Sequence, residues 1–257
     1  MKIAVIHGQS HKGSTYNIAK LFIDRLATSE DEVSEFQTNN ISSCIGCYTC
    51  VLKSEEMCPH SKEVQPIIEA IESADVVIAE SPNYCMGMSG QLKTFFDHMA
   101  YRWISHRPHP SMNNKIGIAI STTAGVGASG TAKSIKKHMF WWGISKIYTV
   151  SEAVAAMNWN GVKPEKKEKI VKKADEISKK ILKKEGKVNP GLKWKIMFNI
   201  MRMQQKNNPW NPADRKHWED NGWIYQEKEN KIFQVDKEEL EIFEKEFSYK
   251  EKRVTDT

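Results

Sequence analysis

Residues 7–15, with the sequence HGQSHKGST, connect a short apolar run to a segment with helical periodicity. The run Lys2–Ile6 is mostly β-branched, and apolar side chains recur at helical spacing over residues 15–26. The connection contains only small, polar and basic residues, and Gly8 and Gly13 permit tight turns. A loop of this composition after a strand presents backbone N–H groups and hydroxyls to an anion. The stretch therefore predicts a site for a phosphorylated cofactor.

The order of residues in this first loop limits the kind of phosphate. It has neither the G-x-x-x-x-G-K-[ST] order of a nucleotide P-loop nor the G-x-G-x-x-G order of a dinucleotide site. We therefore expect a monophosphate rather than a triphosphate or a pyrophosphate. Ser14 and Thr15 offer hydroxyls at the helix start, and His11 and Lys12 offer positive charge. The alternative is an ordinary strand-to-helix turn with a Ser or Thr cap.

A second loop carries a longer and more specific pattern. Residues 81–84 read Ser-Pro-Asn-Tyr, and residues 89–97 read SGQLKTFFD after a short turn with glycine. This arrangement resembles the NAD(P)H-dependent FMN reductases of the flavodoxin-like superfamily, over about residues 1–160. The resemblance implies bound FMN, with its phosphate in the first loop and its isoalloxazine ring against the second loop and a third loop at residues 121–127.

The resemblance also implies which residues contact the cofactor. Those expected to hold the phosphate are Gln9, His11, Lys12, Ser14 and Thr15. Those expected to contact the ribityl chain or the ring are Pro82, Asn83, Tyr84, Met86 and Gly87. Backbone donors to the pyrimidine edge of the ring are expected from Thr122, Thr123, Ala124 and Gly125. No catalytic side chain is assigned, because the flavin itself carries the redox chemistry and the protein mainly orients it.

Hydrophobic periodicity along the chain predicts an alternation of strands and helices. The predicted strands are residues 2–6, 33–37, 75–80, 115–121 and 146–150. The predicted helices are residues 15–27, 62–73, 89–101, 130–142 and 164–184. Such alternation indicates an α/β fold with a parallel sheet covered on both faces. We expect a flavodoxin-like three-layer sandwich with strand order 2-1-3-4-5, plus a mainly helical C-terminal extension.

Four of the five cysteines form a compact run. Cys44, Cys47, Cys50 and Cys58 follow a C-x2-C-x2-C-x7-C spacing, and thiolates so spaced can converge on one cluster. The spacing is similar to that of the iron-sulfur flavoproteins, a branch of the same superfamily with a four-iron four-sulfur cluster near FMN. The alternatives are reduced thiols or an adventitious zinc site. The fifth, Cys85, lies in the second loop and is expected to be a small packing residue.

Length and composition agree with a soluble enzyme. The chain has 257 residues, is 40% hydrophobic and carries a net charge of +6. No segment is long and apolar enough for a membrane span, and no secretion signal is evident, so a cytoplasmic protein is expected. Lysines concentrate in residues 163–187, but an apolar stripe there favours an amphipathic helix on the core over a nucleic-acid-binding or membrane-binding face.

The last third of the chain differs from the rest. We expect an FMN-binding domain at residues 1–187 and a C-terminal extension at residues 188–257. Residues 192–204 are too apolar for a solvated helix, and residues 211–218 and 238–247 indicate two more helices. The extension is expected to pack on a partner subunit in a homodimer or higher homo-oligomer, to cover the flavin site, or to wrap its own domain.

Three functions remain open on the sequence. The first is an FMN-dependent NAD(P)H oxidoreductase that passes electrons to a small acceptor: a quinone, a nitro or azo compound, or flavin. The second is an iron-sulfur flavoprotein that relays electrons through a cluster at the four cysteines, in contact with a redox protein. The third is a non-enzymatic flavodoxin-type carrier, which the positive charge and long extension disfavour.

Overall fold

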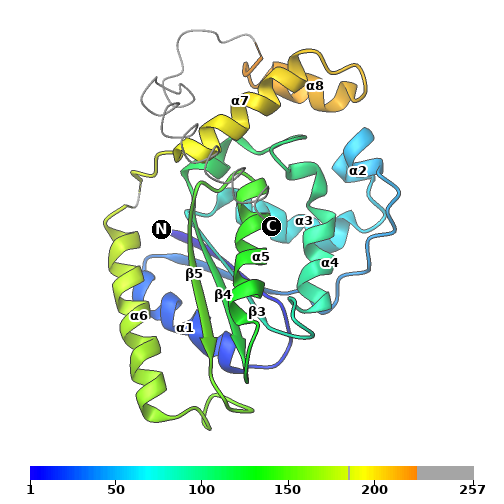
Figure 1. The fold of residues 1–257 in the computed structure, drawn as a ribbon. Helices are drawn as coiled ribbons and strands as arrows, with labels where there is room; N and C mark the ends of the chain where they lie inside the picture. The colour runs from blue at the N-terminus through cyan, green and yellow to red at the C-terminus, as the bar shows by residue number, and fades with distance from the viewer. Residues whose placement is uncertain (185, 225–257) are drawn as a thin grey trace, which may run out of the picture.

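The computed structural model describes residues 1–184 and 186–224. Its five-stranded sheet is parallel, with the order β2-β1-β3-β4-β5 (Figure 1). The strands are β1 (Lys2–His7), β2 (Glu32–Gln37), β3 (Val76–Pro82), β4 (Ile116–Thr123) and β5 (Lys146–Ala153). The predicted fold and strand order are confirmed, and β5 runs three residues beyond its predicted end at residue 150.

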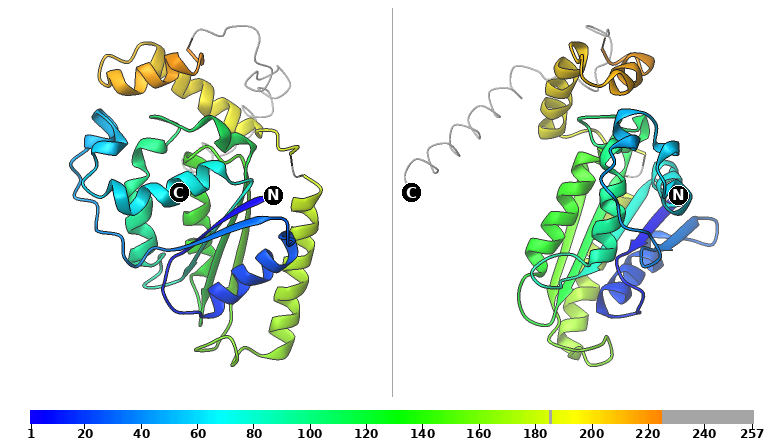
Figure 2. Two further views of the ribbon diagram at one scale, coloured as in Figure 1. Left: turned by 180° about the vertical axis from the view of Figure 1, so that it is seen from behind. Right: turned by 90° about the vertical axis from the view of Figure 1, so that its right-hand side faces the viewer.

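Helices cover both faces of the sheet (Figure 2). On one face α1 (Ser14–Leu26) and α6 (Pro164–Leu182) pack on the buried β-branched residues of the strands. On the other lie α3 (Ser61–Ser73), α4 (Gly90–His98) and α5 (Ala128–Trp141). The amphipathic helix predicted over residues 164–184 is thus confirmed, with Ile170, Ala174 and Ile181 buried against the core. The remaining short elements are α2 (Thr49–Leu52), η1 (Glu55–Met57), η2 (Ala100–Arg102) and η3 (Pro110–Asn114).

Alternation of the side chains along each strand separates the two cores. In β1, Ile3 and Val5 face α1 and α6, whereas Ala4 and Ile6 face α3, α4 and α5. The helix predicted to reach residue 101 ends as α4 at His98, and the chain continues into the separate turn η2. Helix α5 ends at Trp141, one residue before its predicted end, and Gly143 has φ +108°, the left-handed conformation typical of a helix end.

The C-terminal extension forms α7 (Leu192–Lys206) and α8 (Pro212–Asp220), at the end of the sheet opposite the loops that follow the strands (Figures 1 and 2). A third apolar cluster joins them to the core: Ile104, Trp194, Phe198, Trp218, Trp223 and Ile224 are all buried there. The described part of the extension therefore packs on its own domain. It does not cover the predicted flavin loops, so that expectation is wrong for residues 188–224, and the helix predicted at residues 238–247 lies outside the described residues.

No helix within residues 1–184 and 186–224 has both the length and the apolar character needed to cross a membrane.

Candidate functional site

Three loops meet at the carboxyl edge of the sheet, the lower end in Figure 1. Residues 8–13 follow β1, residues 83–89 follow β3, and residues 124–127 follow β4, which are three neighbouring strands. The sequence predicted that these loops lie together, because the loops that follow parallel strands all lie at the carboxyl edge of the sheet. These loops carry the fourteen residues predicted to bind the cofactor, together with the strand ends and first helical residues that flank them.

The first loop is fixed against the start of α4. The Gly8 N–H donates to the Glu80 carbonyl at 2.9 Å, and the Ser89 hydroxyl donates to the Gly8 carbonyl. A Cβ at position 8 would lie 2.7 Å from the Glu80 carbonyl oxygen and 2.9 Å from Ser89 Oγ, so only glycine fits. Within the described chain no side chain caps the N-terminus of α1, which begins just after Gly13. The amides of that first turn are therefore placed for an anion.

Two kinds of side chain surround this helix start. Ser14 and Thr15 are buried at 9% and 2% exposure, close under the loop, whereas His11 and Lys12 are exposed to solvent. Lys12 Nζ lies 5.5 Å from the centre of the Tyr16 ring, where a cation–π contact restrains it. The hydroxyls are therefore inside the loop and the positive charges on its rim.

The second loop is a two-residue hairpin. Tyr84 and Gly87 exchange backbone hydrogen bonds of 2.9 Å in both directions. Between them Cys85 and Met86 have φ values of +47° and +65°, as in a type I′ turn, although neither is glycine. Tyr84, Cys85 and Met86 are all exposed. The prediction that Cys85 is a packing residue is therefore wrong: its side chain lies at the surface of the turn.

Asn83 ties the second loop to the third. Its backbone N–H donates to the Thr122 carbonyl at 2.8 Å, its side-chain Nδ2 donates to the Val126 carbonyl at 3.0 Å, and its Oδ1 accepts from Thr131 at 2.7 Å. Gly127, at φ +99°, leaves room for this amide, since a Cβ there would lie 2.6 Å from Asn83 Nδ2. Asn83 thus sets the relative position of the two loops.

The third loop presents mostly backbone to solvent. The Thr123 hydroxyl donates to the Val126 carbonyl at 2.9 Å and accepts from the Gly125 N–H at 3.4 Å. Thr122 is buried at the strand end, while Ala124 and Gly125 are exposed. Apart from Val126, which is 75% exposed, the side chains of this loop are small or internally bonded, so the backbone is open to solvent at Ala124 and Gly125.

A buried ionic cluster lies beneath the first loop, and sequence reasoning did not find it. His7 Nδ1 is 3.1 Å from Glu80 Oε1, and His7 Nε2 is 3.0 Å from Glu35 Oε2. Burial lowers the pKa of His7, but the hydrogen bonds and charges of Glu80 and Glu35 raise it by more, so the net shift is upward. The two glutamates therefore stabilise the imidazolium against the cost of burial. The sequence shows that His7 adjoins the loop, but Glu35 and Glu80 lie next to His7 only because of the way β2 and β3 pair with β1.

Gln9 is part of this cluster. It is 4% exposed, and its Nε2 donates to Glu80 Oε1 at 3.3 Å. Among the described residues, Gln9 Oε1 and Glu80 Oε2 are buried atoms with no hydrogen-bond partner. Buried polar atoms are usually paired in native proteins, so these two atoms mark a place where a further polar group belongs.

The cysteine run forms a surface segment around α2. Cys44 and Cys47 are exposed, Cys50 and Cys58 are half-buried, and all are free thiols. Burial raises the pKa of Cys50, and the charges of Cys58, Cys44 and Cys47 raise it further. Hydrogen bonds from the Thr49 side chain and backbone lower the pKa of Cys47.

The four thiols do not form a single-ion site in the residues that the structure describes. In the described parts of the chain, no three His, Cys, Asp or Glu side chains are arranged to hold one metal ion. Each thiolate of a cubane binds a different iron, so its ligands stand farther apart than those around one ion. Cys58 also lies 3.9 Å from His98 Nδ1, while His98 Nε2 donates to the Ser42 carbonyl at 2.8 Å. The Nδ1 lone pair can thus accept a hydrogen bond from the Cys58 thiol.

Comparison with known proteins bears on this arrangement. The sequence model of NADPH-dependent FMN reductases matches residues 1–161, which is more than half of the chain. The chain belongs to this family. The protein is an NAD(P)H-dependent FMN oxidoreductase.

Individual relatives fall into two groups. An iron-sulfur flavoprotein of Archaeoglobus fulgidus is 28% identical over 186 residues, 70% of this chain and 79% of the relative. An iron-sulfur flavoprotein of Methanosarcina thermophila is 27% identical, over 62% of this chain and 83% of the relative. An FMN-dependent NADH:quinone oxidoreductase of Burkholderia pseudomallei is 28% identical, over 46% of this chain and 57% of the relative.

Solved structures share the family's fold. An FMN-dependent NADH-azoreductase from Bacillus anthracis, in complex with FMN, has a TM-score of 0.52 at 12% identity, over 70% of this chain and 99% of that one. A flavone reductase has a TM-score of 0.54 at 14% identity, over 74% of this chain and 66% of that one. At such identities the likeness establishes the flavodoxin-like architecture and nothing finer.

Proposed function

We propose that the three loops hold FMN and that the enzyme passes electrons from a nicotinamide through it to a small acceptor, such as a quinone, a nitro or azo compound, or a flavin. The observation that carries the proposal is the uncapped start of α1, with two buried hydroxyls inside a loop pinned by Gly8. When bound, FMN supplies hydride and electron transfer at its ring.

The residues present fit a flavin phosphate. The first amides of α1 and the hydroxyls of Ser14 and Thr15 would bind the phosphate, and His11 and Lys12 would screen its charge from the rim. Gln9 Oε1, buried and with no partner among the described residues, would accept a hydrogen bond from a hydroxyl or from ordered water. The cationic form of His7 would neutralise one of its two glutamates and so reduce their repulsion of the phosphate.

The second and third loops would orient the ring. Tyr84 and Met86 stand exposed on the hairpin, where their side chains can pack on an aromatic ring, and Gly87 keeps the turn narrow. The exposed Ala124 N–H would donate to the pyrimidine edge, and the Gly125 N–H would do so by giving up its 3.4 Å bond to the Thr123 hydroxyl. Asn83 would act indirectly, by fixing the distance between the two loops.

The test is a flavin titration of a double variant. Ser14→Ala with Thr15→Ala should raise the dissociation constant for FMN by at least about tenfold, equivalent to ~1.4 kcal/mol. Ser10→Ala is the matched control, since Ser10 is an exposed serine of the same loop, and it should stay within about twofold. Unchanged FMN affinity in the double variant would refute the phosphate assignment.

A second candidate function is that of an iron-sulfur flavoprotein. It is favoured by the spacing of the four free cysteines along one surface segment, and by the relatives that carry that name. Cys44, Cys47, Cys50 and Cys58 would hold a four-iron four-sulfur cluster, and a redox protein would be the electron partner. A carrier without enzymatic activity fits less well, because the chain belongs to a reductase family and is positively charged.

Iron and acid-labile sulfide measured on anaerobically purified protein test this candidate. About four irons per chain would support it, and Cys47→Ala should abolish them. Cys85→Ala is the matched control, because Cys85 is the exposed cysteine outside the run, and the iron content should not change. Absence of iron and sulfide from the wild-type protein would exclude the iron-sulfur candidate and support an FMN reductase without a cluster.

We also propose a cytoplasmic homodimer, with the rim of the loops at the subunit contact. Tyr84, Met86 and Val126 are 48%, 68% and 75% exposed at this rim, and clustered exposed apolar side chains mark contact surfaces. Light scattering should give twice the chain mass, and Met86→Glu with Val126→Glu should give the monomer. A monomeric wild-type protein at micromolar concentration would contradict the proposal.

A further inference from the structure

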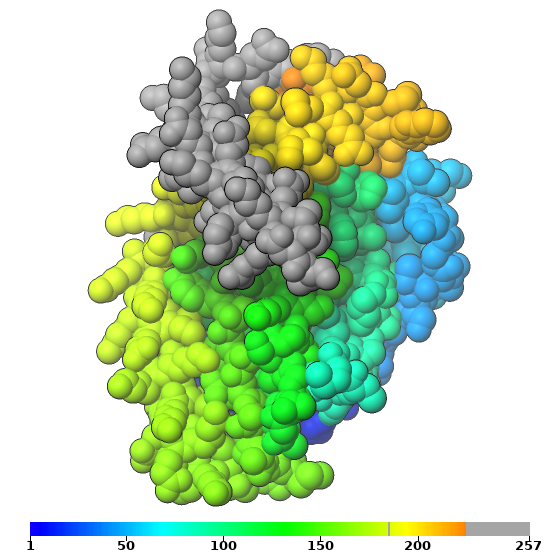
Figure 3. All heavy atoms as spheres, viewed as in Figure 1, coloured from blue at the N-terminus to red at the C-terminus, as the bar shows by residue number. Residues whose placement is uncertain are grey.

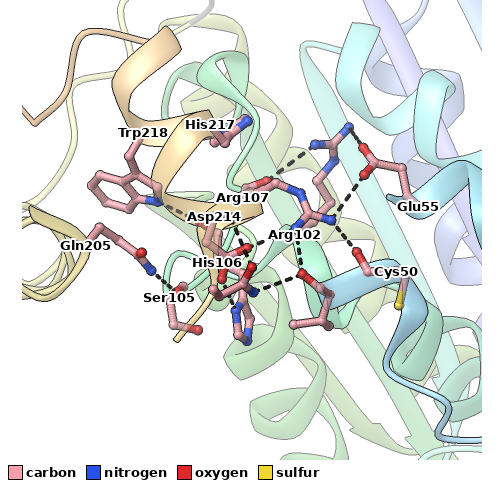
Figure 4. A network of polar contacts seen from close by, with 12 residues as sticks. Cys50, Glu55, Arg102, Ser105, His106, Arg107, Gln205, Asp214, His217 and Trp218 are labelled. Atoms are coloured by element: carbon pink, nitrogen blue, oxygen red, sulfur yellow. Dashed lines mark hydrogen bonds and ion pairs between the residues drawn. The ribbon is translucent and has the colours of Figure 1, made fainter. Parts of the chain in front are cut away.

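One buried arginine joins the cysteine segment to the C-terminal extension. Arg107, whose side chain is 7% exposed, lies in the loop between η2 and η3. Its guanidinium donates to the Val51 carbonyl at 2.8 Å and to the Cys50 carbonyl, and it pairs with Asp214 of α8 at 2.9 Å (Figure 4). The planar guanidinium of Arg107 thus bonds both the backbone of Cys50, the third cysteine of the run, and a helix more than 100 residues later in the sequence.

Helix α8 also contacts the cysteine segment directly. Asn211 Nδ2 donates to the same Val51 carbonyl at 2.9 Å, while Asn211 Oδ1 caps α8 by accepting from the Asp214 N–H at 3.3 Å. Figure 3 shows the two regions side by side, with the residues around position 50 next to those of α8. Two side chains therefore converge on one backbone carbonyl, immediately after Cys50.

The rest of the network holds Arg107 and α8 in place. Asp214, with a side chain 2% exposed, also pairs with His106 at 2.7 Å. Trp218 Nε1 donates to the His106 carbonyl at 2.6 Å, and Gln205 Nε2 donates to the Ser105 carbonyl at 2.7 Å. The loop carrying Arg107 is thus fixed by both helices of the extension.

A second arginine completes the ionic balance. Glu55, just after α2, lies 3.2 Å from Arg107 Nη2 and 3.4 Å from Arg102 Nη2, and Arg102 pairs with Glu72 at 2.6 Å. Each buried charge has a partner of opposite sign, so removing one leaves another uncompensated. The cysteine segment has little order of its own, because α2 has four residues and so short a helix is unstable alone.

We propose that α8, through Asp214, Asn211 and Arg107, is a clamp that positions Cys50 and its neighbours as cluster ligands, so that the C-terminal extension is part of the cysteine site. The proposal rests on the iron-sulfur candidate above. Ligands held by a surrounding shell of hydrogen bonds bind a metal group more tightly than ligands that must be ordered on binding. Arg107 and Asn211 bond backbone carbonyls and Asp214 bonds Arg107, so the three would act as positioning residues.

The experiment compares Asp214→Asn with Asp220→Asn in the full-length chain. Both substitutions remove one carboxylate charge from α8, but within residues 1–184 and 186–224 Asp220 pairs with exposed Lys216 alone, at 2.8 Å. Hydrogen exchange of the iron-free protein should be at least about tenfold faster at residues 49–57 in Asp214→Asn, and unchanged in Asp220→Asn. After anaerobic reconstitution, iron per chain should fall to less than about half in Asp214→Asn only, with FMN content the same in all three proteins.

Arg107→Lys provides the second variant if Asp214→Asn does not fold. It keeps the positive charge but cannot bond two carbonyls and two carboxylates at once, so it should show the same faster exchange and lower iron content. Wild-type exchange at residues 49–57 in a folded clamp variant would overturn the proposal, as would full iron content. If the wild-type protein takes up no iron, the iron-sulfur candidate fails. Faster hydrogen exchange in Asp214→Asn but not in Asp220→Asn would still support a clamp on the cysteine segment.

Discussion

Replacing His7 by glutamine should destabilise the protein by about 3 kcal/mol. His7 lies 3.1 Å from Glu80, which is fully buried, and 3.0 Å from Glu35. Removing one partner of a buried ion pair costs about 3–5 kcal/mol, because the other charge stays buried without compensation. We expect the lower end of this range, since Gln9 keeps its 3.3 Å hydrogen bond to Glu80 and the Glu35 side chain is 36% exposed to water.

The effect should depend on pH in a defined direction. The pKa of His7 is raised above its ordinary value of 6.5, as the two glutamates outweigh the opposing effect of burial. A raised pKa in the folded state means that the stabilisation is fully present below pH 6.5 and is lost as the pH rises through the folded value. The difference in free energy of unfolding between the wild type and His7→Gln should therefore be largest near pH 6 and smaller near pH 9.

Urea denaturation at those two pH values measures the difference. Glu35→Gln is the control, because a pair with one partially exposed member contributes less than about 1 kcal/mol. A loss below about 1 kcal/mol for His7→Gln near pH 6, or equal losses at the two pH values, would refute the view that a cationic His7 neutralises Glu80 beneath the first loop.

Three further predictions concern other parts of the molecule. Gly127→Ala places a Cβ 2.6 Å from Asn83 at a residue with φ +99°, so it should destabilise the protein by about 1–3 kcal/mol and weaken FMN binding. Gly130→Ala is the control: its Cβ meets open space in α5, so it should be neutral or stabilise the protein by up to about 1 kcal/mol. Thermal denaturation measures both variants. Trp218→Ala removes a fully buried ring from the third apolar cluster and should cost about 3–5 kcal/mol by urea denaturation; a cost under about 1 kcal/mol would mean that the extension contributes little to folding. Asp175→Ala breaks the pair with Arg25 between α1 and α6, and since Asp175 is 45% exposed the change should stay below about 1 kcal/mol in the same assay.

The sheet and its loops could be predicted because their signals are local. Runs such as Lys2–Ile6 bury both faces of a parallel strand, and the helix that follows each strand has its own apolar stripe. The order of the strands then brings the three loops together. The conformation of the hairpin could not be predicted, because Cys85 and Met86 adopt left-handed φ values that their side chains disfavour and only the surrounding loop imposes.

The ionic clusters could not be predicted, because they depend on contacts between distant residues. His106 has no acidic neighbour in the sequence, yet Asp214 lies 2.7 Å away in the fold. His7 and Glu80 are 73 positions apart and meet through the register of β1 on β3. The positions of α7 and α8 could not be predicted for the same reason. Their apolar residues indicated that the helices pack on another surface, but not which one.

The bond between Ser89 and Gly8 has a consequence for how the protein folds. The two residues are 81 positions apart, and the Ser89 hydroxyl both donates to the Gly8 carbonyl and accepts from the Leu92 N–H at the start of α4. Contacts between distant residues form late, because closing a long loop costs entropy before the contact compensates for it. The first loop therefore acquires its final shape only after β3 has paired with β1 and α4 has begun. During synthesis, a chain shorter than about 90 residues would carry the whole first loop and still be unable to hold a phosphate there.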